Sequence, residues 1–321
     1  MVTPLGKMKY ALTFFFVLLA ANFLMAQNVR DGAGVNKAPD GAGHGVHDAA
    51  PSGNAVVTGN GINYNGGPVM KGTVNTYIIW YGNWNGTGSN TPATQAAIQT
   101  YLANLNNSAP YLVNTTYGDA SGNVSGLTNF GGSTTVNSST NLSDSGVLTQ
   151  VSNAITSGRL PKDTNGVYFV LTSSNIRETS GFCTRYCGWH THGTVGGSDI
   201  KYSFVGNVDR CPSGCEIQPT GPNSPAANLG GIDGMANVMF HELSEAVSDP
   251  DLNAWFDSSG QENGDKCNFN FGATSTCNAN GLCTAAGTAA AAKYNQTFGN
   301  HNYMLQQMWE NANGGACVQH L

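Results

Sequence analysis

A histidine and two glutamates occur at a spacing that suits metal chemistry in the stretch NVMFHELSEAVSDPD, residues 237–251. Successive residues of a helix turn by about 100°, so His241 and Glu245 lie one turn apart on one face, whereas Glu242 points to the side. This is the geometry of the zinc-binding H-E-x-x-H helix, with a glutamate in place of the second histidine. The spacing predicts His241 and Glu245 as metal ligands and Glu242 as the catalytic base that activates a metal-bound water.

A zinc site of this kind needs a third protein ligand from another segment of the chain. Downstream of the predicted helix lies WFDSSGQENGDKC, in which Glu262 and Asp265 precede a cysteine. We expect Glu262 to be the third ligand, with Asp265 and Asp249 as alternatives. The expected ion is zinc; calcium is the alternative, because carboxylates are hard oxygen donors that also suit that cation.

A second group of candidate ligands lies in CTRYCGWHTH, residues 183–192. On an extended strand, His190 and His192 project to the same side, which is a common chelating arrangement. They are expected either to complete a site with His241 or to bind a metal by themselves. The alternative is a loop that disulfides hold in place, on which both histidines are exposed.

The acidic helix also has an ordinary interpretation, because four-residue motifs recur by chance and many surface helices carry such residues beside an apolar face. Two features favour a metal site instead. Only 10 % of the chain is charged, yet acidic residues gather in and just after this helix. The motif also follows predicted core elements rather than lying in a polar tail.

The elements that would hold these residues follow from the spacing of apolar residues. Thr91 and Pro92 form the start of a helix, in which threonine caps and proline occupies the first turn. Strands are predicted over residues 69–84, 166–176 and 200–208, and helices over 91–105, 143–158, 231–249 and 301–312. Strands that alternate with helices predict a single α/β domain with a mixed sheet flanked by helices, zincin-like in fold and disulfide-bonded in its C-terminal half.

The beginning of the chain predicts export. Lys7 and Lys9 precede an apolar run that ends at the small residue Ala26, which is typical of a secretory signal peptide over residues 1–26. Residues 27–66 are rich in glycine and poor in large apolar residues, so we expect a flexible leader. The folded α/β domain is then expected over residues 67–321.

All eight cysteines follow residue 180, and an even number in an exported chain predicts disulfide bonds. The two C-x3-C pairs would alternatively suit a metal–thiolate cluster, and the sequence leaves the pairing open. The disulfide candidates are Cys183, Cys187, Cys211, Cys215, Cys267, Cys277, Cys283 and Cys317.

The order of several short motifs is similar to that of a known family. The chain contains GPVMKGTVNTYIIWYGNW, GVYFVLTSSNI, FCTRYCGWH, CPSGC and GIDGMANVMFHELSEAVSDP in this order, before a late cysteine. Over residues 66–320 this resembles the EXORDIUM, or phosphate-induced protein 1, family, in its bacterial type. The resemblance implies an exported or cell-wall-associated protein. The plant pattern has small apolar residues where this chain has His241, Glu242 and Glu245, so the resemblance implies no metal role for them.

Two functions are therefore expected as alternatives. The first is an exported metal-dependent hydrolase, a zincin-like zinc metallopeptidase that acts on extracellular peptide or cell-wall material. The second is a non-catalytic secreted protein associated with the cell wall or with growth. The formal net charge of −6 and the lack of a Lys/Arg run argue against a nucleic-acid partner. After signal cleavage we expect no stable membrane span, because no second apolar run of sufficient length follows.

Overall fold

The computed structural model describes residues 61–225, 229–258, 260–277, 282–283 and 292–321. The predicted signal peptide and the predicted leader up to residue 60 lie outside the described residues. Residues 61–66, at the end of the predicted leader, include the short strand β1 (Asn63–Tyr64), which pairs antiparallel with β9 (Trp255–Phe256).

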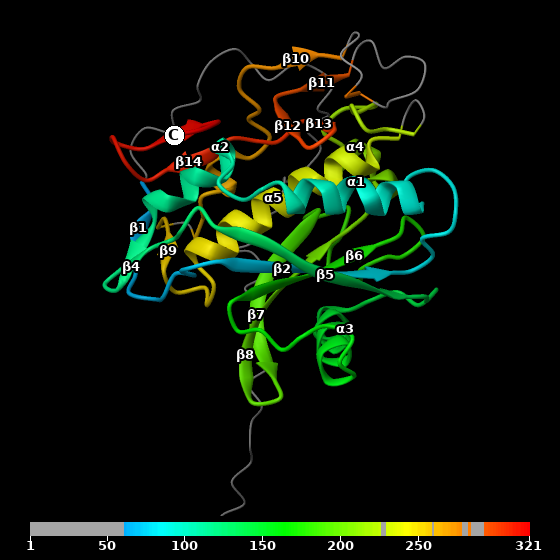
Figure 1. Cartoon of the computed structure of the whole chain (residues 1–321), viewed down its shortest axis with the longest axis horizontal. Coiled ribbons are helices and arrows are strands. Elements are labelled where there is room, and N and C mark those ends of the chain that lie inside the picture. The colour runs from blue at the N-terminus through cyan, green and yellow to red at the C-terminus, as the bar shows by residue number, and fades with distance from the viewer. Residues whose placement is uncertain (1–60, 226–228, 259, 278–281, 284–291) are drawn as a thin grey trace, which may run out of the picture. The chain divides into compact units, whose positions relative to one another are not determined.

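A five-stranded mixed sheet with the order β5-β2-β6-β8-β7 forms the centre of the described part of the chain (Figure 1). Four neighbouring strands run parallel, and the edge strand β7 runs antiparallel to β8. The strands are β2 (Val74–Tyr81), β5 (Thr128–Val136), β6 (Gly166–Thr172), β7 (Gly188–Val195) and β8 (Ser198–Val205). The predicted mixed α/β architecture is therefore confirmed.

The burial of the strands follows from their composition. Every residue of β6 is buried, as expected for a nearly continuous apolar run inside a parallel sheet that is covered on both faces. The edge strand β5 instead alternates between exposed and half-buried residues along most of its length. The three strands predicted from the sequence correspond to β2, β6 and β8.

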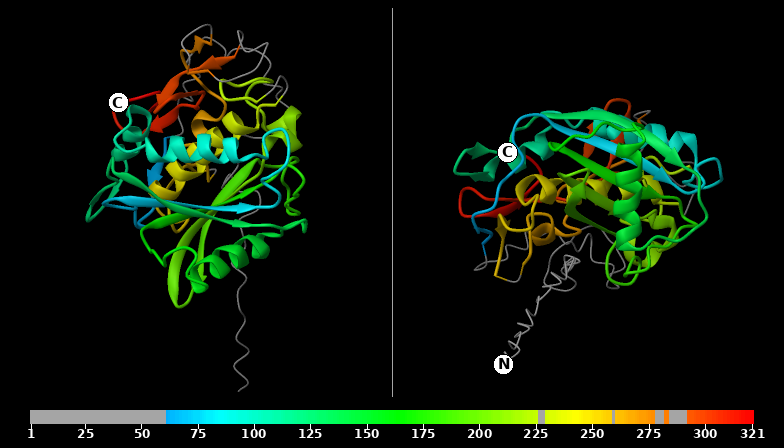
Figure 2. Two further views of the ribbon diagram at one scale, coloured as in Figure 1. Left: turned by 45° about the vertical axis from the view of Figure 1, so that its right-hand side comes forward. Right: turned by 90° about the horizontal axis from the view of Figure 1, so that it is seen from below.

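Three long helices cover this sheet, namely α1 (Pro92–Ala103), α3 (Asp144–Thr156) and α5 (Gly231–Ser248). Two of them begin at side-chain caps, since the backbone N–H of Thr94 donates to Thr91 Oγ1 and that of Gly146 donates to Ser143 Oγ. Helix α5 ends at Ser248, just before Pro250, as its sequence predicts. Figures 1 and 2 show α1 and α5 on one face of the sheet and α3 on the other.

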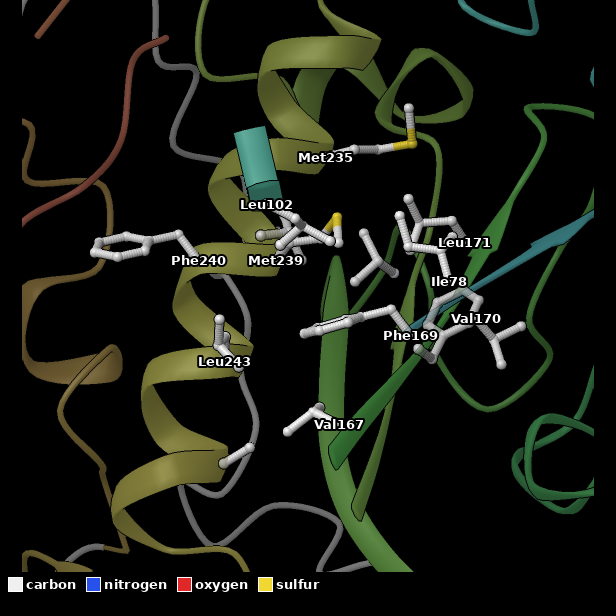
Figure 3. Close-up of a cluster of buried hydrophobic side chains, with 14 of the residues drawn as sticks. Ile78, Leu102, Val167, Phe169, Val170, Leu171, Met235, Met239, Phe240 and Leu243 are labelled. Carbon is white, nitrogen blue, oxygen red and sulfur yellow. The ribbon is translucent and has the colours of Figure 1, made fainter. Parts of the chain in front are cut away.

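Helix α5 is the central helix of the fold, and all of its residues are buried. Figure 3 shows Met239 facing Phe169 of β6, while Phe240 points away from the sheet. The alternative interpretation of this segment as an ordinary surface helix is therefore wrong. Because the whole helix is enclosed, its polar side chains are enclosed as well.

Strand β7 places the H-x-H pair against α5. It forms a hairpin with β8 through Gly196 and Gly197, whose φ angles of 55° and 76° suit the type I′ turn that matches the twist of two antiparallel strands. His190 is buried and His192 is half-buried. The prediction of a disulfide-held loop with two exposed histidines is wrong, because this segment pairs with β8 as the edge of the sheet.

The other described elements are short. They are α2 (Ala109–Leu112), η1 (Val113–Thr116), β3 (Gly118–Asp119), β4 (Gly122–Asn123), η2 (Val208–Arg210), α4 (Pro212–Cys215), η3 (Asp265–Cys267), β10 (Ser275–Thr276), β11 (Lys293–Tyr294), β12 (Gln296–Phe298), β13 (His301–Tyr303), β14 (Met308–Glu310) and β15 (Ala316–Val318). The predicted helix over 301–312 is wrong. Its apolar residues instead occur on β13, on β14 and between them, and these strands pair with β12 and β15. Tertiary pairing outweighs the local spacing here.

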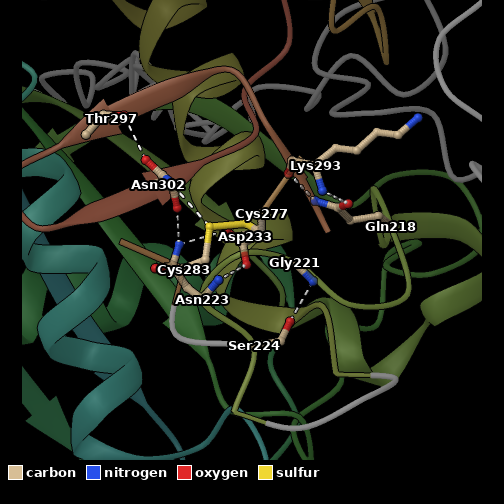
Figure 4. The surroundings of a disulfide bond; sticks show 10 residues. All are labelled: Gln218, Gly221, Asn223, Ser224, Asp233, Cys277, Cys283, Lys293, Thr297 and Asn302. Atoms are coloured by element: carbon tan, nitrogen blue, oxygen red, sulfur yellow. Dashed lines mark hydrogen bonds between the residues drawn. A yellow bond between two sulfur atoms is a disulfide. The ribbon is translucent and has the colours of Figure 1, made fainter. Parts of the chain in front are cut away.

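The cysteines form four disulfides, which makes the metal–thiolate alternative wrong. The pairs are Cys183–Cys211, Cys187–Cys215, Cys267–Cys317 and Cys277–Cys283. The first two cross-link the C-x3-C segments to each other. Figure 4 shows the last one beside Asn302, whose side-chain amide donates to Cys283 Sγ. Four disulfides are compatible with an extracellular protein.

Within the described residues, no helix combines the length and the apolar character that crossing a membrane requires.

Candidate metal centre

Five buried side chains from three segments converge beside the inner face of β7. One comes from the strand, two come from α5, one comes from the turn before η3 and one is the first residue of η3. They are His190, His241, Glu245, Glu262 and Asp265. None of these side chains is more than 3 % exposed. They form two groups of three that share Glu245, and in each group the possible ligand atoms lie within 4.8 Å of one another.

The first group is built on the predicted helical pair. His241 Nε2 lies 2.9 Å from Glu245 Oε1 and 3.6 Å from Asp265 Oδ1. The one-turn spacing of the two helical residues thus produces the expected contact. Asp265, which the sequence predicts as an alternative ligand, completes this group.

The second group joins the strand to the same helix. His190 Nε2 lies 3.2 Å from Glu262 Oε2 and 3.7 Å from Glu245 Oε2. Glu262, the first choice for a third ligand, therefore lies beside Glu245 but meets the imidazole of His190. The predicted set of His241, Glu245 and Glu262 therefore does not form one group, because Glu262 shares its group with His190 and His241 shares its group with Asp265.

Asp249 belongs to neither group. Its Oδ1 accepts hydrogen bonds from the backbone N–H groups of Asn253 and Ala254, each at 2.6 Å. These contacts form the turn that follows α5 and use the carboxylate for local structure. Burial raises the pKa of Asp249 to about 6.

His192 lies in a separate cluster further along β7. Its Nδ1 lies 2.8 Å from Asp199 Oδ1 and 3.9 Å from Asp251 Oδ1. The ammonium group of Lys201 contacts both of these carboxylates. This cluster therefore already contains a cation, and the two histidines of the H-x-H pair have different surroundings.

Glu242 is fully buried beside this centre. A methyl group added at Gly188 would lie 3.1 Å from Glu242 Oε1, so the absence of a side chain at Gly188 leaves room for the carboxylate against β7. Neither carboxylate oxygen of Glu242 has a hydrogen-bond partner among the described residues. An unpartnered buried carboxylate is costly unless a cation or a proton compensates it.

Gln306 orients the imidazole of His241. Its Nε2 donates to the carbonyl of Gly264 at 2.8 Å, which identifies its Oε1 as the acceptor for the Nδ1–H of His241 at 3.2 Å. With one proton on Nδ1, the Nε2 atom faces Glu245 and Asp265, where it would bind a metal once it carries no proton itself. This is how an outer hydrogen bond orients a metal-binding histidine.

Several contacts hold the turn that carries Glu262 and Asp265 against α5. The side-chain amide of Asn263 donates to the carbonyl of Ser244 at 3.2 Å, and the backbone N–H of Asp265 donates to Glu245 Oε1 at 3.2 Å. A methyl group added at Gly264 would lie 2.9 Å from Glu245 Oε1, so only glycine permits this close approach. The Cys267–Cys317 disulfide follows directly.

The two histidines differ in charge preference. Burial lowers the pKa of His190 to about 4, so its imidazole is neutral at pH 7 and able to bind a metal. Burial also opposes protonation of His241, but the negative charge of Glu245 and the hydrogen bond with Asp265 outweigh it and raise its pKa well above the usual value.

Three carboxylates in or beside the centre, those of Glu242, Glu262 and Asp265, bind protons more strongly than usual. Burial, followed by the charge of Glu245, raises the pKa of Glu262 well above its usual value and that of Asp265 to about 7. Burial also raises the pKa of Glu242 well above the usual range. In the described part of the chain, the ion pairs of Glu245, Glu262 and Asp265 are with histidine. A metal ion would replace protons here.

Comparison with known proteins identifies the family. Residues 62–319 match the model of the phosphate-induced protein 1 conserved region. The chain belongs to the phosphate-induced protein 1 family. Every candidate ligand lies within the matched residues, so the centre is part of the family domain in this chain.

Two members of the phosphate-induced protein 1 family from Arabidopsis thaliana are similar to the chain. Protein EXORDIUM-like 5 is 29 % identical over 222 residues, which are 61 % of this chain and 59 % of that protein. Protein EXORDIUM-like 3 is 25 % identical over 229 residues, which are 61 % of this chain and 64 % of that protein. The match thus spans about three fifths of each relative. No solved structure matches the chain.

Sequence reasoning missed how some of these side chains are arranged in this member of the phosphate-induced protein 1 family. It did not predict the contact between His190 and Glu262. Two signals were present: the alternation of the H-x-H pair indicates one face of a strand, and the glycine at position 188 indicates that another element packs closely against that strand. It gave no signal for Gln306, which lies in the segment predicted as a helix. In the structure this residue lies between β13 and β14.

Proposed function

We propose that this chain is an exported metalloprotein and that metal-dependent hydrolysis is the activity its centre supports best. The observation that carries this proposal is the convergence of two imidazoles and three carboxylates, all buried, from β7, α5 and residues 262–265. Groups that would each be costly to bury become favourable around a cation.

Zinc is the ion that these ligands favour. Imidazole nitrogen is a common ligand of zinc, whereas calcium takes oxygen ligands. His190 and His241 would be the nitrogen ligands, and Glu245, Glu262 and Asp265 the carboxylate ligands. A bound zinc ion would supply Lewis acidity and a more acidic water.

Glu242 is the candidate catalytic base. It follows a ligand directly, its carboxylate is buried and unpartnered among the described residues, and its high pKa due to burial suits proton transfer. The proposed substrates are extracellular peptide or cell-wall material, and the proposed enzyme class is a zincin-like peptidase.

A second candidate function is non-catalytic, with a metal that stabilises a secreted wall-associated or growth-associated protein. The observation in its favour is the burial of the centre, since none of the five side chains is more than 3 % exposed. Catalytic zinc sites keep one coordination position open to substrate, whereas structural sites are closed.

The decisive experiment measures metal content and hydrolysis on the same samples. Secreted protein is dialysed against metal-free buffer, analysed by mass spectrometry for bound metals, and assayed on casein and peptidoglycan peptides. We expect wild type and Glu242→Gln to retain their zinc, His241→Ala to retain less zinc than wild type, and only wild type to hydrolyse substrate. His192→Ala is the matched control, because His192 belongs to the other cluster.

Three results would change this conclusion. Wild type without bound metal would refute the metalloprotein. Metal-loaded wild type without hydrolysis, or Glu242→Gln with unchanged hydrolysis, would refute the catalytic role, and the first of these would favour the non-catalytic candidate.

A further inference from the structure

We propose that the centre binds two divalent cations and that Glu245 bridges them. This inference rests on the metal binding proposed above and specifies its stoichiometry. One cation would be held by His241, Asp265 and Glu245 Oε1, and the other by His190, Glu262 and Glu245 Oε2.

The orientation of Glu245 is the first argument. Its Oε1 lies 2.9 Å from His241 Nε2, whereas its Oε2 lies 3.7 Å from His190 Nε2. Each oxygen therefore faces a different imidazole. A carboxylate that presents one oxygen to each of two ligand groups is arranged as a bridge.

The distances within each group are the second argument. A tetrahedral ion with bonds of about 2.1 Å separates its ligand atoms by about 3.4 Å. The measured separations from His241 Nε2 are 2.9 and 3.6 Å, and those from His190 Nε2 are 3.2 and 3.7 Å. In each group, the two separations from the imidazole thus suit the ligands of one zinc ion, and all three ligand atoms lie within 4.8 Å of one another.

A single ion does not account for all five side chains. The ligands of one ion with 2.1 Å bonds lie within about 4.2 Å of one another. Among the described residues, the five side chains fall into two groups that share only Glu245. They do not form one group in which all possible ligand atoms lie within 4.8 Å of one another. His190 and His241 never occur in the same group.

Charge is the third argument. Four buried carboxylates lie in or beside the centre: Glu242, Glu245, Glu262 and Asp265. Their combined charge of −4 is balanced by two divalent cations, with both imidazoles neutral. One divalent cation would leave two buried negative charges that need protons, and uncompensated buried charge is costly.

Paired metal ions in hydrolytic enzymes are the chemical precedent for such a bridge. Carboxylate-bridged ions in hydrolytic centres lie about 3.5–4 Å apart and bind the two sides of a reacting group together. The ligand that this centre would take is therefore a pair of divalent transition-metal ions, for which zinc is the natural candidate and manganese a spectroscopic probe.

The test is a titration of metal-stripped full-length protein. Protein treated with EDTA and dialysed is titrated with zinc by equilibrium dialysis, and a parallel sample is loaded with Mn²⁺ for electron paramagnetic resonance. We expect two ions per chain and the spectrum of a magnetically coupled Mn²⁺ pair. These two measurements need no variant, so they do not depend on how well a variant folds.

Three variants assign the ions. His190→Ala and His241→Ala should each bind one ion, and the Mn²⁺ spectrum should become that of an isolated ion. His192→Ala should still bind two ions. If this variant bound only one ion, the second ion of the wild type would belong to the cluster of His192, Asp199 and Asp251.

Each contrary outcome has a distinct meaning. No bound zinc refutes the proposed metal binding itself. One ion per chain in wild type leaves that proposal intact and refutes the paired centre. Two ions with an uncoupled Mn²⁺ spectrum, or a loss of one ion in His192→Ala, refute the bridge through Glu245.

Discussion

The hydrogen bond between His241 and Gln306 offers a sharp test of how the centre is positioned. Replacing Gln306 by methionine keeps the length and approximate volume of the side chain but removes both its acceptor and its donor. The Nδ1–H of His241 then loses its acceptor at 3.2 Å, and the carbonyl of Gly264 loses its donor at 2.8 Å. Metal binding should weaken, because the orientation of the imidazole is no longer determined.

The expected size of the effect follows from these two contacts. Loss of an outer hydrogen bond to a metal-binding histidine weakens metal affinity by about 10–100-fold, equivalent to about 1.4–2.8 kcal/mol. The unsatisfied carbonyl of Gly264, which is next to Asp265, should also lower the free energy of unfolding by about 1–3 kcal/mol. Both effects should appear together in Gln306→Met.

The assay is zinc competition against a chromophoric chelator, combined with urea unfolding. Gln307→Met is the matched control, because Gln307 is the adjacent buried glutamine and its amide faces Gly272 instead of the centre. Wild-type zinc affinity in Gln306→Met would contradict the positioning role. Equal losses in both variants would attribute the effect to general destabilisation.

Three other predictions concern the turn, the disulfide and the pH dependence. Gly264→Ala should lower zinc affinity at least tenfold in the same competition assay, because its methyl group would lie 2.9 Å from Glu245 Oε1. Gly61→Ala is the control and should leave zinc affinity unchanged, because its added methyl group meets nothing within 4 Å. Replacing both Cys267 and Cys317 by serine should lower the free energy of unfolding by about 4 kcal/mol, which is the value for a disulfide loop with a sequence separation of 50. The double replacement should weaken zinc binding as well. An unchanged midpoint of urea unfolding would contradict this prediction. In EDTA, the free energy of unfolding should fall as the pH rises from 3.8 to about 7. The pKa of Asp265 is raised from 3.8 to about 7 in the folded state, which therefore binds this proton more tightly than the unfolded state does. This difference in proton binding contributes up to about 4 kcal/mol. With saturating zinc the slope should reverse, because deprotonated ligands bind the ion, and equal slopes in both conditions would refute a role of Asp265 as a ligand.

Helix α5 was the most predictable part of the centre. Its apolar period and Pro250 beyond its end predict its position, and the i, i+4 spacing predicts the contact between His241 and Glu245. The burial of its polar side chains was not predictable from this pattern. Burial depends on the turn before η3 and on β7, which come from other parts of the chain.

The association of His190 with Glu262 shows the limit of local reasoning. The two residues are 72 positions apart, and the contact depends on β7 folding back along β8 and on a disulfide that holds the later turn. Such contacts depend on tertiary pairing, which periodicity alone does not specify. The same limit explains the error at residues 301–312, where an apolar spacing compatible with a helix belongs to two short strands.

Strand β7 provides an internal comparison that bears on the need for metal. His190 and His192 project from the same face of the strand, and each meets a pair of carboxylates. Around His192, the ammonium of Lys201 contacts both acidic partners and supplies the compensating charge within the chain. Around His190, the acidic partners are Glu245 and Glu262, and in the described part of the chain they form ion pairs only with imidazoles. Burial lowers the pKa of His190 itself to about 4. In the described part of the chain, the cluster around His192 thus contains a lysine and the cluster around His190 does not. The carboxylates around His190 therefore need cations from solution, or protons, if they are to stay buried at neutral pH.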